Sequence, residues 1–477
     1  MSTADAIDRA GQRLADRVNP IVVKEIRQGL RTRVFWIFFA LMLLACLIIS
    51  LIAFATADGV GKDGRYYFIA YYVCLSLVQF FVIPYSAYRS MSREREEETW
   101  VLLTLTGIGP HRILRGKMGS FMLQGLIYAS AAAPFLLFSY YLNGIDLPTI
   151  VLAVIAGATY QLFLTSVAVS AATLAEARVV RALLHFLVLG FLSWGLITGL
   201  SSIFGLVESM RSIWSDSTAR VVACATMFGM LTWGVLLYEA AAARMALATE
   251  SYAKGPRLAF IVQVAGALGF FAWGAATSGE PSLYSVGCIT MCVHVFVVGI
   301  FVASDRDGMA RSLWLEGSRF SLLKPGALRG YRLVLLLLLA VTAVFVALMF
   351  LDGAPANMQN FYVAVSAPAF AALYLSLPII ASRLLRHPPS QTPVLVRILF
   401  IGIFVFGAGA PPLVATIIGL EPDHRVLNLF NPIVGLINIG EAKAAADTPV
   451  ILLGAVAFGA VVLADAILKG RDNPPAK

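Results

Sequence analysis

Charge is what this sequence has least of. Asp, Glu, Lys and Arg make up 13% of the 477 residues, whereas 59% are hydrophobic, and an average soluble protein has about 25% charged residues. So little charge cannot cover a large apolar interior with polar surface, which excludes an ordinary soluble protein and predicts one whose solvent is lipid. The net charge of +9 sits between the apolar runs, so it does not indicate a nucleic-acid partner.

Cysteine is also scarce, and all five residues lie inside apolar runs, at Cys46, Cys74, Cys224, Cys288 and Cys292. A thiol in such a run packs as a small hydrophobe, and no disulfide framework is indicated. Cys288 and Cys292 lie near His294 but lack a fourth ligand, which favours packing over a metal site. We therefore expect no bound metal.

The common catalytic and nucleotide-binding motifs are missing. Gly116 and Lys117 are followed by Met118 and lack the upstream glycine of a phosphate-binding loop. Neither the zinc-protease pattern nor the nucleophile elbow of hydrolases occurs. The first 33 residues lack the apolar core and cleavage site of a secretory signal, so the first apolar run is expected to remain as an anchor. The sequence predicts no catalytic residue, no bound cofactor and no enzymatic activity of its own.

Long apolar runs are what the sequence has in abundance. Twelve are long enough to cross about 30 Å of hydrocarbon as helices: 34–56, 67–88, 119–141, 149–173, 182–206, 220–239, 258–278, 283–303, 333–351, 361–382, 398–420 and 448–468. The predicted class is therefore an all-α integral membrane protein. The apolar stretch Asn428 to Gly440 is too short to span and is expected to form a re-entrant or interfacial helix.

The distribution of cations predicts the orientation of these spans. With the N-terminus inside, 30 of the 36 Lys and Arg residues lie on the inner side, and such residues resist translocation. Both termini are therefore expected in the cytoplasm, with the chain in the plasma membrane. Glu239 and Asp465 fall near cytoplasmic ends, so no full charge is expected near a span centre.

Two long cytoplasmic loops, 89–118 and 304–332, divide the spans in a similar way. A shift of 214 residues places Trp100, Leu114, Arg115 and Gly116 on Trp314, Leu328, Arg329 and Gly330. These matches favour two parallel six-span units, 1–250 and 251–477, of which the second is a diverged repeat. Spans of one membrane thickness also recur at similar intervals without duplication, so both interpretations stay open.

The most informative loop is 92–117, which reads SREREEETWVLLTLTGIGPHRILRGK. Its carboxylates are typical of a helix N-terminus, so we expect a short helix from Glu94 to about Leu105, a break at Gly107 and Gly109, and a basic segment leading into the third span. The alternative is a loop whose apolar residues lie on the membrane surface.

The segment 19–33 precedes the first span and reads NPIVVKEIRQGLRTR. Its apolar residues Val22, Ile26 and Leu30 recur every four positions between charged ones, as in a helix lying in the interface plane. We expect an elbow helix formed by Val22, Lys24, Glu25, Ile26, Arg27, Leu30 and Arg31. A basic anchor that only sets orientation fits the same pattern.

These two segments, in this order around two spans, resemble the permease subunits of ATP-binding-cassette type-2 exporters. The positions that match the family's motif after the second span are Glu94, Arg95, Glu96, Thr99, Leu102, Leu103, Thr106, Ile113, Gly116 and Lys117. Glu98 replaces the family's glycine and Gly107 its proline. The resemblance covers about residues 15–250, one six-span unit.

The resemblance implies a coupling helix that contacts a separate ATPase subunit through these residues, with Trp100 as an added apolar anchor. ATP and Mg would then bind to the partner, two copies of which are expected. The chain would work as a homodimer or supply both transmembrane halves itself as a pseudo-dimer. Its function would be that of a permease for export.

Polar residues inside the predicted spans are candidates for a substrate pathway, because each is costly in lipid. They are Gln79, Gln124, Gln161, His185, Gln263 and His294. The first three are the pathway candidates; hydrogen bonds between helices are the alternative role. Two other functions stay open: an ion-coupled secondary transporter, which needs a charge near the midplane, and a polytopic membrane enzyme acting at the outer interface through Glu421, Asp423 and His424.

Overall fold

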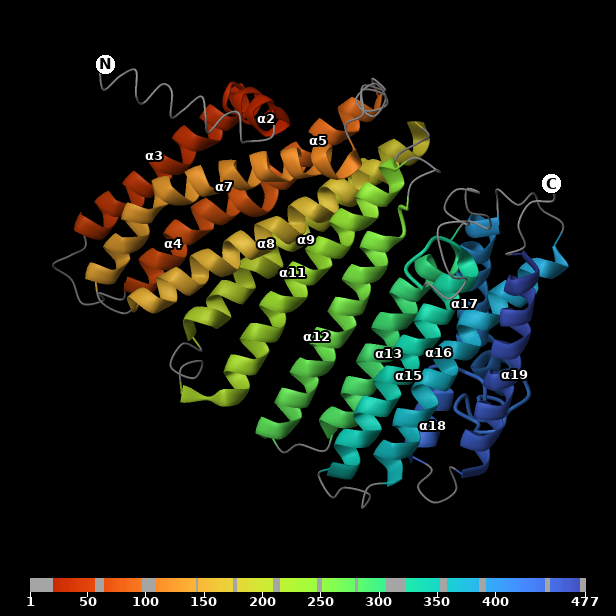
Figure 1. Cartoon of the computed structure of the whole chain (residues 1–477). Coiled ribbons are helices and arrows are strands. Elements are labelled where there is room, and N and C mark those ends of the chain that lie inside the picture. Colours follow the sequence, from red (N-terminus) through yellow and green to blue (C-terminus); the bar gives the residue numbers. More distant parts are fainter. Residues whose placement is uncertain are drawn as a thin grey trace. The chain divides into compact units, whose positions relative to one another are not determined.

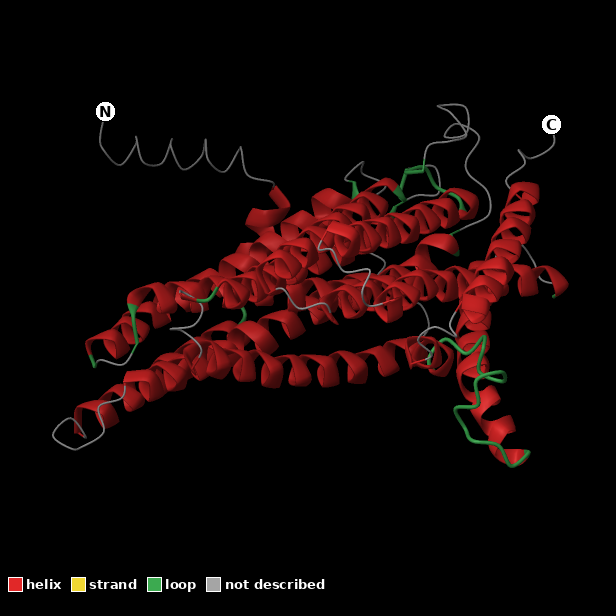
Figure 2. Cartoon of the chain, turned by 90° about the horizontal axis from the view of Figure 1, so that it is seen from below, coloured by secondary structure: helices red, strands yellow, loops and turns green. Residues whose placement is uncertain are grey.

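A computed structural model describes most of the chain. The described residues are 20–55, 64–96, 109–142, 145–174, 178–208, 215–246, 251–278, 282–305, 322–351, 358–385, 392–441 and 447–471. Within these ranges every regular element is a helix, as Figure 2 shows. Twelve of the described helical segments are long and apolar enough to cross a membrane. The predicted helical membrane class is confirmed.

Unit 1, Met1–Ala246, is the first of two compact units. It begins with the short helix α2 (Pro20–Leu30), and Figure 1 shows this helix where α3 begins. Its long helices are α3 (Arg33–Ala55), α4 (Gly64–Ser76) continued by the π-helix η1 (Leu77–Val82) and α5 (Ile83–Glu96), α7 (Pro110–Tyr141), α8 (Leu147–Leu174), α9 (Arg178–Glu208) and α11 (Ser217–Met245).

The second compact unit is unit 2, Leu247–Lys477. Its helices are α12 (Lys254–Ser278), α13 (Ser282–Ala303), α15 (Ala327–Leu351), α16 (Met358–Leu384), α17 (Thr392–Ile417), the short α18 (Val434–Glu441) and α19 (Asp447–Arg471).

The helices of each unit pack around its fourth span. In unit 1 this helix is α8, which contacts α5, α7, α9 and α11; in unit 2 it is α16, which contacts α13, α15, α17 and α19. The first span of each unit packs mainly on the second, as α3 does on α4 and α12 on α13. The two units therefore share one order of helix packing.

Large apolar side chains cover the outside of the described helices. In α3, Trp36, Leu41 and Leu44 are each more than half exposed, and only 17% of its span is buried. A soluble protein does not leave such continuous apolar surface to water. This surface fits hydrocarbon, in which helices satisfy their own backbone hydrogen bonds.

The segment 418–441 of unit 2 folds differently from the expected single helix over Asn428 to Gly440. Asn431 is fully buried, and its Oδ1 accepts hydrogen bonds from the backbone N–H groups of Ile433 (3.0 Å) and Val434 (3.1 Å). This side chain caps the start of α18. The helix therefore occupies only Val434–Glu441.

Candidate functional site

A buried lysine joins three segments of unit 1. Lys117 Nζ, on α7, lies 2.7 Å from Glu94 Oε1, 3.0 Å from Ser90 Oγ and 3.5 Å from Glu25 Oε2. Its side chain is only 1% exposed, against 9% for Glu25 and 19% for Glu94. We call these four residues the lysine node. It connects α2, the end of α5 and the first turns of α7.

The chemistry of the lysine node explains how a charge can be buried there. An ammonium group has three N–H donors and no acceptor, and here Ser90 and the two carboxylates surround it. Burying the cation is costly without such partners. Removing the lysine alone would therefore leave buried carboxylates without its charge and weaken the packing of the three helices.

The bend between α2 and α3 is fixed by local hydrogen bonds. Trp36 Nε1 donates to the carbonyl oxygen of Leu30 at 2.9 Å, and Thr32 Oγ1 donates to that of Gly29 at 2.7 Å. Gly29 also lies against α7, because an added methyl there would be 2.5 Å from Gln124 Nε2. These contacts place Glu25 beside Lys117.

The residues predicted to contact an ATPase fall into three groups. Glu94, Arg95 and Glu96 form the last turn of α5, so the expected helix beginning at Glu94 is wrong at its start. The span-two helix instead continues past the expected end, with Lys117 and Arg181 (2.9 Å from Glu96) neutralising carboxylates that a helix C-terminus disfavours.

The second group is buried and the third lies outside the described residues. Ile113, Gly116 and Lys117 face the interior of unit 1, so they position α7 and are not part of an exposed surface. The predicted contacts at Thr99, Trp100, Leu102, Leu103 and Thr106 fall within 97–108, outside the described residues.

The elbow residues divide by face. Lys24, Arg27 and Arg31 are exposed and line a shallow groove of about 560 Å³, while Ile26 and Leu30 are half-buried. Glu25 is buried in the lysine node. Val22 belongs to α2, but its side chain lies outside the description.

Two of the three pathway glutamines line the same cavity. A cavity of about 380 Å³ among η1, α7 and α8 is lined by Gln79 and Gln161, with Leu126 and Val154 among its apolar residues. Gln79 lies on the π-helix, a form that is frequent at functional sites, and its Nε2 donates to the carbonyl oxygen of Gly125 at 3.4 Å. Gln161 Nε2 donates to that of Phe121 at 3.1 Å. Gln124 instead faces α2.

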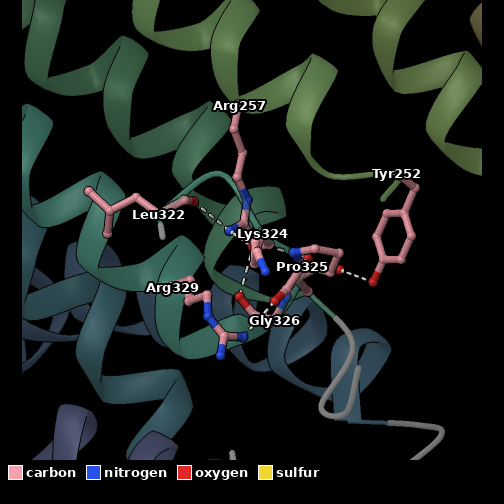
Figure 3. Close-up of polar contacts among 8 residues, drawn as sticks. Tyr252, Arg257, Leu322, Lys324, Pro325, Gly326 and Arg329 are labelled. Atoms are coloured by element: carbon pink, nitrogen blue, oxygen red, sulfur yellow. Dashed lines mark hydrogen bonds and ion pairs between the residues drawn. The ribbon is translucent and has the colours of Figure 1, made fainter. Parts of the chain in front are cut away.

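Unit 2 contains a second buried cation, Arg257, which the sequence analysis did not select. Its side chain is 2% exposed, and its guanidinium donates to Asp305 Oδ2 (3.0 Å) and to three backbone carbonyl oxygens, those of Leu322 (2.8 Å), Lys324 and Gly326 (3.0 Å). Figure 3 shows Arg257 reaching from α12 into the turn that precedes α15. We call Arg257, Asp305 and this turn the arginine node.

Asp305 completes the arginine node. Its Oδ2 also accepts the N–H of Gly326 at 3.2 Å, and its Oδ1 accepts the hydroxyl of Tyr252 at 3.1 Å. Gly326 has φ 123°, a conformation that favours glycine. No spacing rule finds this node, because most of the acceptors are backbone atoms; the only sequence signal is an Arg after Gly-Pro at the start of a span.

A further ion pair lies inside unit 2. Arg332 on α15 binds Asp465 on α19 through two hydrogen bonds of 2.8 and 3.2 Å, and Lys469 lies 2.9 Å from the same carboxylate. Asp465 is therefore paired both with a residue of another helix, Arg332, and with a residue of its own helix, Lys469. It lies six residues before the end of α19, about 9 Å along a helix.

Gly330 allows α15 to approach α13 closely. A methyl group added at Gly330 would lie 2.0 Å from the carbonyl oxygen of Val302, whereas one at Gly269 meets no described atom within 4 Å. Gly330→Ala is therefore expected to destabilise the protein by about 2 kcal/mol through overpacking. Thermal unfolding in detergent measures the effect, with Gly269→Ala as the matched control. Equal unfolding midpoints for the two variants would contradict this packing.

The repeat predicted from a shift of 214 residues can be inspected at three of its four pairs. Leu114 and Leu328 are both buried, as are Gly116 and Gly330, but Arg115 is exposed where Arg329 is 3% exposed. Trp100 and Trp314 lie outside the described residues.

In the described part of the chain, no three His, Cys, Asp or Glu residues are grouped so that they could hold a metal ion. Cys288 Sγ instead donates to the carbonyl oxygen of Ala364 at 3.5 Å. In the connection between α17 and α18, Glu421 and Asp423 are exposed and His424 is half-buried.

The fold and these sites define a multi-pass integral membrane protein with a buried ionic node in each unit. No protein family, curated protein or solved structure matches the chain significantly.

Proposed function

We propose that this chain is the transmembrane permease subunit of an ATP-driven exporter, similar to those of ATP-binding-cassette type-2 systems. The observation that carries the proposal is the lysine node. Its charged members come from the elbow helix and from both ends of the loop motif, the segments on which the family resemblance rests. The described structure supports a direct physical connection between them.

The proposed mechanism is mechanical coupling. The segment 97–108 connects the end of α5, at Glu96, to the start of α7, at Pro110. A partner that moves this segment would pull on α5 and α7, and the lysine node makes α2 follow, because separating the buried charges is costly. ATP and Mg would act on the partner, and this chain would transmit the movement to its spans.

We also propose that one chain supplies both halves of the pathway. The shared order of helix packing supports this, and so does the arginine node. In each unit a buried cation joins the region of the first span, the end of the second and the start of the third. Two parallel units of this kind would receive two ATPase copies on the cytoplasmic side.

The cavity lined by Gln79 and Gln161 is the proposed start of the substrate pathway. It is mostly apolar with two amides, which suits an amphipathic molecule. The cations of the arginine node and of the Arg332 pair lie within a few residues of helix ends. That placement favours an ATP-driven permease over an ion-coupled carrier, which needs a charge near the midplane.

A photo-crosslinking experiment tests the ATPase partner. A photoreactive amino acid replaces Trp100, or Tyr141 as the control at the other end of α7, where the side chain is 78% exposed. We expect the first variant to crosslink, in native membranes, to a protein that is also labelled by azido-ATP. Crosslinking of both variants to the same protein, or azido-ATP labelling of this chain itself, would refute the proposal.

Cysteine labelling tests the proposed orientation. In a background with all five native cysteines replaced by alanine, Lys24→Cys and Tyr141→Cys are treated in intact cells with a membrane-impermeant maleimide. Both positions are exposed, and the charge bias predicts labelling only at position 141. Labelling of position 24 in intact cells would show that the orientation is the opposite of the proposed one.

A further inference from the structure

A second basic site lies beside the lysine node. A cavity of about 640 Å³ opens between α5 and α9, and its described lining includes the cations Arg89, Arg93 and Arg181. The single carboxylate among the described lining residues is Glu96, which is committed to Arg181 at 2.9 Å. The cavity thus has an excess of positive charge.

Two of these arginines repel each other. Arg89 and Arg93 are four residues apart on α5 and exposed, and like charges at this spacing destabilise a helix. Within the described part of the chain neither has an ion-pair partner. An anion between them would remove the repulsion and form charge-assisted hydrogen bonds with both guanidinium groups.

The floor of the cavity offers further donors. Tyr88 is 2% exposed and Ser92 is 9% exposed; their side chains lie close to each other, but neither hydroxyl makes a hydrogen bond of good geometry to a described atom. His185 also lines the cavity, and its Nε2 lies 3.3 Å from the hydroxyl of Tyr85. Buried hydroxyls are normally fully paired, and a hydrogen bond to an anionic oxygen would satisfy these two better than their contact with each other.

An apolar surface continues from the cavity along α9. Leu183 is 60% exposed, Phe186 72% and Leu187 57%; Phe186 lies one helical turn beyond the lining residue Ala182 on the same side of α9, and Leu183 and Leu187 flank it. A soluble anion gains nothing from contact with an apolar surface, whereas the acyl chains of a lipid pack against it. The combination matches a phosphate head group with its hydrocarbon chains beside it.

We propose that this cavity binds the phosphate head group of an anionic phospholipid. The head group lies between Arg89 and Arg93, near the hydroxyl of Tyr88, and the acyl chains follow the exposed face of α9. The bound lipid neutralises two cations near the end of α5, which directly precede the lysine-node residues Ser90 and Glu94 in sequence. The site is independent of the proposed ATPase partner and stands if that proposal fails.

A lipid titration tests the site. The purified full-length protein in detergent is titrated with dioleoylphosphatidylglycerol, dioleoylphosphatidylcholine or inorganic phosphate, and adducts are counted by native mass spectrometry. Arg89→Gln with Arg93→Gln is expected to weaken phosphatidylglycerol binding about tenfold. Arg383→Gln with Arg425→Gln, which removes two exposed arginines elsewhere, is the control and is expected to leave it within about twofold.

Each outcome has a definite meaning. Equal phosphatidylglycerol binding by both double variants, or equal binding of phosphatidylcholine, would overturn the proposal. Inorganic phosphate that competes fully at millimolar concentration would show that the site takes a soluble anion and would also overturn it. If the glutamine variant does not fold, Tyr88→Phe replaces it and is expected to weaken the phosphatidylglycerol interaction several-fold, and an unchanged affinity would count against the site.

Discussion

Replacing Lys117 with methionine is expected to lower the unfolding free energy by about 3 kcal/mol. Methionine retains the length of the side chain but removes the charge, so that Glu25 and Glu94, 9% and 19% exposed, lose their contact with the buried ammonium group. The expected result is a lower midpoint temperature of thermal unfolding in detergent. If the proposed function holds, partner-dependent transport is lost as well, because α2 no longer follows α5 and α7.

A charge-free version of the lysine node separates lost charge from lost packing. Lys117→Met with Glu25→Gln and Glu94→Gln removes all three charges and is expected to recover most of the stability, because an apolar or neutral replacement of a buried ion pair is often nearly neutral. Lys469→Met is the matched control, since this lysine is 59% exposed in its pair with Asp465 and such pairs contribute little. A triple variant no more stable than Lys117→Met would show that the node is not an ionic interaction.

Replacing Arg257 with lysine is expected to loosen the turn before α15 while the charge is retained. Lysine presents one nitrogen instead of a planar fork, so it cannot reach Asp305 and three carbonyl groups at once. Each hydrogen bond from a charged donor stabilises by about 1.5 to 3 kcal/mol. Loss of one such bond is enough to make local opening about tenfold more frequent.

Limited trypsin digestion measures this opening. Arg329 is 3% exposed at the start of α15, so trypsin reaches its peptide bond only when this region opens, and cleavage there follows the population of the opened state when opening is fast. We expect cleavage of Arg257→Lys to be about tenfold faster than that of the unchanged protein. Arg383→Lys, at an exposed position of α16, is expected to leave the rate unchanged. Identical rates for the two variants would mean that Arg257 does not hold the turn.

Residues with a strong hydrophobic pattern are enough to predict helices from the sequence alone. Trp36, Leu41 and Leu44 mark the first span through their own hydrophobicity, and α3 begins and ends within one residue of its predicted limits. The amphipathic period of 19–33 likewise predicted α2 within a few residues. Glu94, by contrast, was assigned to the wrong end of a helix, because a run of carboxylates alone does not reveal the neutralising Lys117, 23 residues further along the chain.

The sequence by itself determined the class of protein, its twelve apolar helices and the places where polar segments interrupt them, because hydrophobicity and backbone satisfaction in lipid act residue by residue along the chain. Only the tertiary structure decided which charges meet. Lys117 finds Glu25 across 92 positions of sequence, and Arg257 finds backbone carbonyl groups that carry no side-chain signature. A buried cation pairs with whichever acceptors lie near it in space, because a low-dielectric interior makes an unpaired charge costly wherever it lies in the sequence.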